Sequence, residues 1–151
     1  MDSINARAPS SLGRMADTVM LGMLALAALV ALVIGNEYGG MGLALGGAVA
    51  LLAAGALAHT LARGTTLSRM TLTLCLAAMV ALHIQLGRGT IEFHFGVFVT
   101  LALLLMYRDW RPIVVGAAFF AVHHILIDRL QAAGFPVYCT PQADFLKILM
   151  H

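Results

Sequence analysis

Charge is scarce in this 151-residue chain. Asp, Glu, Lys and Arg together make up 11% of the residues, whereas residues of the AVILMFWYC set make up 61%. A soluble globular domain carries roughly 25% charged residues, so this composition excludes an ordinary soluble domain and predicts an integral membrane protein. The net charge of +2 is small and the basic residues are scattered, so nucleic-acid binding has no support.

The chain has little cysteine and no recognisable catalytic motif. Of the two cysteines, Cys75 lies inside an apolar run and Cys139 in a polar connection. A disulfide between them would need similar depth in the membrane, which this placement does not give. We interpret Cys75 as a small apolar packing residue. No catalytic triad, phosphate-binding glycine loop or carboxylate dyad is found in the sequence, so we do not expect an enzyme.

Long apolar runs dominate the chain. Five complete segments are predicted to cross the membrane, at residues 16–35, 41–62, 70–87, 93–107 and 112–131. The connections are short and carry Gly, Pro or charge, which makes neighbouring helices antiparallel. A further apolar run, DFLKILMH, stops within about two turns of its start.

These segments predict an all-α, polytopic transmembrane helix bundle with five complete helices and the start of a sixth. Residues 16–151 form the bundle, after an N-terminal tail of residues 1–15. Five crossings would leave the C-terminus outside, away from any cytosolic partner. We therefore expect a fragment of a longer chain or a truncated protein.

The basic residues predict the orientation of the bundle. Six lie on the side of the N-terminus and three on the other side; the six are Arg7, Arg14, Arg63, Arg69, Arg108 and Arg111, and the three are Arg88, Arg129 and Lys147. The positive-inside rule then places the N-terminus in the cytoplasm. The membrane that we expect is the inner membrane of a bacterium. Loops 36–40, 88–92 and 132–144 would face outward.

Five of the six histidines lie inside or at the edge of apolar segments, and all five fall in the outer leaflet. They are His83, His94, His123, His124 and His151. Ionisable side chains are expensive in hydrocarbon and usually mark a functional site. A buried imidazole needs partners for both ring nitrogens, and a metal on one with an acceptor on the other meets both needs. His59, near the inner end of the second segment, is expected at the membrane interface.

Haem b, one or two groups, is the cofactor that we predict for these histidines. A bis-histidine haem needs two imidazoles facing each other across a flat macrocycle in an apolar slot. The predicted iron ligands are His83, His94, His124 and His151. His123 and His124 diverge by about 100° on a helix, so only one of them is expected in a given site. Contacts that support the ligands are expected from Gln85, Glu92, Arg88, Asp128 and Arg129. The two arginines lie at the outer rim, where the propionate groups of the haem would emerge.

Two alternatives remain open. A single copper or zinc ion could bind the same histidines with Glu92, which would make the chain a metal-ion sensor or transporter. The absence of an MxxM cluster near the outer surface counts slightly against copper, because thioether ligands favour Cu(I). A membrane electron-transfer haem protein is the other alternative. Because all the predicted histidine ligands lie in one leaflet, electron transfer across the whole bilayer is disfavoured.

One part of the chain resembles a known family. The motifs HIQ, ExHF, YRDWRP and HH occur in this order within residues 80–151, followed by VYCTP. This stretch resembles the multi-pass membrane sensor region at the N-terminus of bacterial methyl-accepting chemotaxis proteins and related diguanylate cyclases.

The resemblance implies a receptor input domain, a homodimer and a cytoplasmic signalling domain in the full-length chain. With the haem prediction, the expected signal is redox state or a diatomic gas. The YRDWRP motif is interpreted as an interfacial anchor, with Trp and Tyr at the headgroups. The alternative interpretation of this motif is a contact that relays a structural change to a cytosolic domain.

Overall fold

The structure, a computed structural model, describes residues 11–141, and all of its regular elements are helices. They are α1 (Ser11–Tyr38), α2 (Met41–Ala62), α3 (Thr66–Leu86), α4 (Ile91–Leu104), the short 3-10 helix η1 (Leu105–Tyr107) and α5 (Trp110–Ala132). The all-helical prediction is confirmed for these residues. The predicted sixth helix falls within 142–151, outside the described residues.

Four helices, α1, α2, α3 and α5, are long and apolar enough to cross a membrane. The fourth segment, α4 continued by η1, is a shorter apolar helix over Ile91–Tyr107. The prediction of five complete crossings is therefore supported for four helices only. Because α1 begins at Ser11, the last residues of the predicted tail 1–15 are helical.

Local sequence signals set the helix ends. The hydroxyl of Thr65 caps α3 by accepting a hydrogen bond from Ser68 N at 3.3 Å. The carboxylate of Asp109 caps α5 by accepting one from Arg111 N at 3.0 Å. Such caps satisfy backbone N–H groups that have no partner in the first turn. Pro112 lies in that turn of α5, where a proline costs no helical hydrogen bond.

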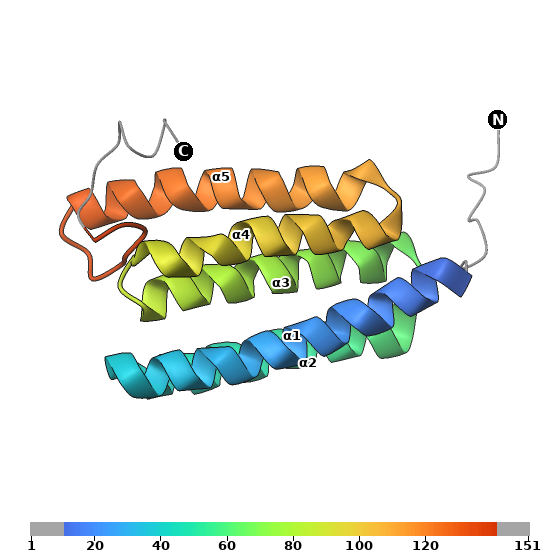
Figure 1. Ribbon diagram of the computed structural model, residues 1–151, viewed down its shortest axis with the longest axis horizontal. Coiled ribbons are helices and arrows are strands. Elements are labelled where there is room, and N and C mark those ends of the chain that lie inside the picture. Colours follow the sequence, from blue (N-terminus) through green and yellow to red (C-terminus); the bar gives the residue numbers. More distant parts are fainter. Residues whose placement is uncertain (1–10, 142–151) are drawn as a thin grey trace.

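Helix α3 is the central element of the bundle (Figure 1), and it packs against α1, α2, α4 and α5. In its most apolar stretch 61% of the residues are buried, against 17% to 33% in the other three long helices. Small residues bring α1 and α2 close together: a Cβ built on Gly35 would lie 2.5 Å from the Cβ of Ala44. Small residues thus allow close packing of the first two helices.

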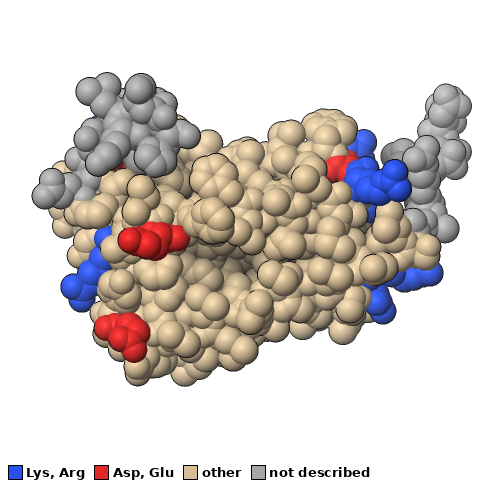
Figure 2. All heavy atoms as spheres, viewed as in Figure 1, with Lys and Arg blue, Asp and Glu red and all other residues tan. Residues whose placement is uncertain are grey.

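The bundle has two polar ends. At one end, on the left in Figure 1, lie the α1–α2 and α3–α4 turns and the segment that follows α5. We call this the outer end, after the predicted orientation. Charged side chains gather towards the two ends of the visible face, and none interrupts its middle (Figure 2). This distribution suits a protein that crosses a bilayer.

Candidate metal site

His94, His124 and Cys139 lie together at the outer end. Their possible ligand atoms, one from each residue, are all within 4.8 Å of one another. A triangle with sides of at most 4.8 Å has its corners within about 2.8 Å of one point. Metal–nitrogen and metal–sulfur bonds are about 2.0 to 2.3 Å long. A small closing movement would therefore let all three residues bind one ion.

Three separate elements supply these side chains. His94 lies in the first turn of α4, and His124 lies in α5 about two turns before its end. Cys139 belongs to residues 133–141, which follow α5 and which we call the strap. The strap contains a turn and bends but no helix or strand, and Cys139 within it is fully buried. An ion at this site would cross-link α4, α5 and the strap.

Backbone hydrogen bonds fix the tautomers of both histidines. His94 Nδ1 lies 3.1 Å from Thr90 O, and His124 Nδ1 lies 2.8 Å from Phe120 O. A carbonyl oxygen only accepts hydrogen bonds, so Nδ1 carries the proton in each ring and Nε2 carries the lone pair. Donation of the second ring N–H to a carbonyl is the usual support of a metal-binding histidine.

Two glutamine side chains hold the strap. Gln85, at the end of α3, donates from Nε2 to Pro136 O at 3.2 Å and accepts from Tyr138 N at 2.8 Å through Oε1. Gln131, at the end of α5, donates from Nε2 to Thr140 O at 2.9 Å and accepts from Cys139 N at 3.3 Å through Oε1. Each carboxamide thus pairs with the strap backbone on both its donor and its acceptor side. The cysteine is positioned from two helices at once.

Gly89 allows the strap to approach the α3–α4 turn. Its φ of 77° lies in the left-handed region that favours glycine. A Cβ at this position would lie 2.5 Å from the carbonyl carbon of Thr140, next to Cys139. The close contact therefore requires glycine at position 89.

His83 and His123, two of the other predicted histidines, are not members of this trio. His83 is buried in α3, and its Nε2 donates to Ala27 O of α1 at 2.8 Å, which joins the two helices. His123 neighbours the site: its ring is 5.6 Å from that of His124 between centroids and stacks on Phe119. His123 Nδ1 is buried and has no hydrogen-bond partner among the described residues. His151 lies outside the described residues.

The predicted supporting residues take different roles. Asp128 is fully buried in α5 and pairs with its neighbour Arg129. Arg88 donates from a terminal nitrogen to Tyr38 O at 3.3 Å, which joins the outer ends of α3 and α1. Glu92 is exposed in the first turn of α4. Gln85 contacts the strap, where a contact with a histidine was expected.

The sequence interpretation missed Cys139 as a site residue. The sequence did contain an indication of this role, because Cys139 lies in a polar outer connection on the same side of the membrane as the histidines. Burial and the nearby carboxylate of Asp128 raise the pKa of the Cys139 thiol to about 11. The thiol is therefore protonated near neutral pH and must lose its proton to an incoming ion.

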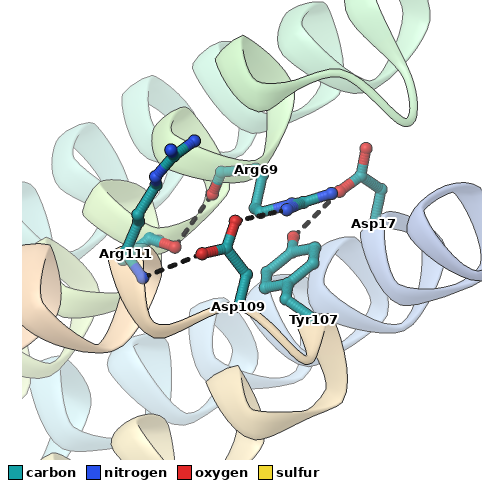
Figure 3. A network of polar contacts seen from close by, with 6 residues as sticks. Asp17, Arg69, Tyr107, Asp109 and Arg111 are labelled. Carbon is teal, nitrogen blue, oxygen red and sulfur yellow. Dashed lines mark hydrogen bonds and ion pairs between the residues drawn. The ribbon is translucent and has the colours of Figure 1, made fainter. Parts of the chain in front are cut away.

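A second polar cluster lies at the inner end (Figure 3). Asp17 of α1 is fully buried; its Oδ1 accepts from the hydroxyl of Tyr107 at 2.9 Å, and its Oδ2 accepts from Gly64 N at 2.7 Å. The guanidinium of Arg69 pairs with Asp109 at 2.7 Å and stands 5.1 Å from the centre of the Tyr107 ring. These contacts tie α1, the α2–α3 turn and α3 to the YRDWRP segment.

The YRDWRP segment therefore has two parts. Tyr107 and Asp109 point into the inner cluster, which gives this motif a structural role beyond membrane anchoring. Trp110 is 67% exposed and Arg108 is exposed, as an interfacial anchor requires.

Comparison with known proteins gives one partial similarity. Sixty residues, 40% of the chain, are 35% identical to part of "Transducer protein Htr8" of Halobacterium salinarum. The match covers 9% of that protein's length, so the chain corresponds to a small part of it. No protein-family profile matches the chain, and no solved structure matches it. The similarity is consistent with a transducer-like sensor region.

Proposed function

We propose that this chain is a membrane-embedded sensory input domain that binds a transition-metal ion through His94, His124 and Cys139. The observation that carries the proposal is the convergence of these three side chains at the outer end. The similarity to part of a transducer protein supports the sensory role. In the full-length chain, the signal would pass to a cytoplasmic output domain of the kind found in chemotaxis receptors or diguanylate cyclases.

The site geometry favours a single ion over haem b. The rings of His94 and His124 meet edge to face, with centroids 5.5 Å apart and planes at 64°. A bis-histidine haem needs an open slot for the macrocycle between its two imidazoles. Here Cys139 lies within 4.8 Å of both rings' ligand atoms and supplies a third donor. Haem b stays a prediction, which metal content and an absorption spectrum separate from a bound ion.

An ion at this site would act by tightening the strap. Bonds to His94, His124 and Cys139 would draw the strap onto α4 and α5. The strap is tied to α3 through Gln85, and α3 packs against α1, α2, α4 and α5. A ligand that binds one arrangement of the strap better than another shifts the population of the whole bundle. No catalytic step is required of the chain.

The first experiment determines which species binds. The chain is purified in detergent from cells supplied with haem and metals, and its metal content and absorption spectrum are recorded. We expect about one copper or zinc ion per chain, no Soret band, and loss of the ion in His94→Ala and His124→Ala. His59→Ala, at the inner end, is the matched control and should retain the ion. A Soret band with stoichiometric iron would replace this proposal with the haem prediction.

A second experiment tests the sensory role. Hydrogen exchange is followed in lipid nanodiscs with and without the ion. The amide of Gly64, bonded to buried Asp17, reports on the inner end, far from the site. A sensor should change the protection of this amide when the ion binds at the outer end. Changes confined to the strap and the ends of α4 and α5 would contradict a signalling role and leave a metal-binding protein.

A further inference from the structure

We infer that the ion is copper, bound as Cu(I), and that Cys139 is the residue that selects it. This inference rests on the proposed function, because it names the ion that the same site binds. Three properties of the site support it: the donor set, the number of donors and the charge.

The donor set is two imidazoles and one thiolate. Trigonal sites with two histidines and one cysteine are typical of protein copper, and a soft thiolate favours Cu(I). No MxxM motif lies at the outer end of the bundle, because Met20 and Met23 belong to the inner half of α1. Cys139 supplies the soft sulfur in its place. With the proton on Nδ1 of His94 and of His124, Nε2 is the nitrogen that would coordinate an ion in both rings.

The number of donors also favours Cu(I) over zinc of the structural type. Structural zinc sites have four ligands in a tetrahedron. In the part of the chain that the structure describes, the cluster contains three ligating side chains. Cu(I) accepts three-coordinate, trigonal geometry, and three side chains satisfy it completely.

The charge of the loaded site gives a third argument. Cys139 is fully buried, and the nearby charges of Asp128 and Arg129 form an ion pair. Cu(I) bound to one thiolate and two neutral imidazoles has no net charge, whereas Zn²⁺ in the same shell leaves one positive charge. Burying an uncompensated charge costs free energy, so the neutral copper complex is favoured.

Competition titrations test the inference. The chain in detergent is titrated without oxygen with Cu(I) buffered by bicinchoninate, and separately with Zn²⁺ buffered by a zinc chelator. We expect tighter binding of Cu(I), and a decrease in Cys139→Ser that exceeds the roughly 10- to 100-fold loss seen when a residue that only supports a ligand is mutated. Cys75→Ala is the matched control: it removes the other buried cysteine, on α3, and should bind Cu(I) as the parent does.

A spectroscopic measurement distinguishes loss of the thiolate ligand from a general disturbance of the strap by the substitution. Oxidation of the bound Cu(I) by ferricyanide transfers one electron and gives Cu(II) and ferrocyanide. A thiolate bound to Cu(II) produces an intense visible charge-transfer band. We expect this band in the parent and in Cys75→Ala, and its loss in Cys139→Ser.

The outcomes separate the two proposals. Tighter binding of Zn²⁺, or Cu(I) binding that does not depend on Cys139, would overturn the copper inference and leave the metal site standing. Absence of the visible band from the oxidised parent would likewise overturn thiolate ligation of copper. Binding of neither ion would overturn the proposed function itself.

Discussion

Replacement of Gly89 by alanine should weaken ion binding without removing any ligand. Gly89 has a φ of 77°, and its missing Cβ would lie 2.5 Å from the carbonyl carbon of Thr140. An alanine there strains its own backbone and pushes against the strap beside Cys139. The perturbation therefore acts on the position of the thiol and leaves the chemistry of the three donors unchanged.

The size of the effect follows from these distances. Ordinary van der Waals contact begins at 3.4 Å, so Thr140 must move by about 0.9 Å. Metal–ligand distances tolerate about 0.2 Å, so such a shift beside Cys139 should impair its bond to the ion. Disturbing a residue that supports a ligand typically lowers metal affinity about 10- to 100-fold. The left-handed backbone that an alanine would have to adopt at this position adds about 1 to 2 kcal/mol of destabilisation.

Gly39→Ala provides the matched control. Gly39 has a φ of 79°, and no atom lies within 4 Å of the position that a Cβ would take there. Both variants should therefore lower the thermal midpoint in detergent, but only Gly89→Ala should lower ion affinity in a chelator competition. Equal affinities in the two variants would refute the argument that contact between Gly89 and the strap positions Cys139.

Two further predictions concern the inner cluster and pH. Tyr107→Phe removes the hydrogen bond to buried Asp17 and should destabilise the bundle by about 2 kcal/mol, seen as a lower thermal midpoint; an unchanged midpoint would contradict this role of the bond. A change in ion affinity would show that the inner cluster and the site are coupled. Because the pKa of the Cys139 thiol is raised to about 11, each bound ion must release one proton. Affinity should therefore rise about tenfold per pH unit between about pH 7 and 9 in the parent, and the slope should flatten in Cys139→Ser; a parent affinity that does not vary with pH would contradict thiolate binding.

The helices were predictable because their signal is strong. Runs of about 20 apolar residues separated by Gly, Pro or charge define a membrane bundle with little ambiguity, and the boundaries of α2 were predicted at both ends. The fourth segment was harder, because α4 gives way to a 3-10 turn at Leu105 and the helix up to Tyr107 remains short. Hydropathy alone does not report such a change of helix type.

The site was predictable only in part. Depth along the helices placed His94 and His124 in the same leaflet, and the structure brings them together. The same reasoning grouped His83 with them, yet it bonds to Ala27 of α1, because depth along a helix says nothing about which face a side chain takes. Cys139 escaped notice because it lies in a loop, whose path depends on contacts with Gln85 and Gly89 that periodicity does not encode.

X-ray absorption at the metal edge of the ion-loaded chain tests the proposed site most directly. We predict a shell of two imidazole nitrogens and one sulfur, with the sulfur at about 2.3 Å and absent in Cys139→Ser. A shell of nitrogen and oxygen alone in the parent chain would contradict the site formed by His94, His124 and Cys139.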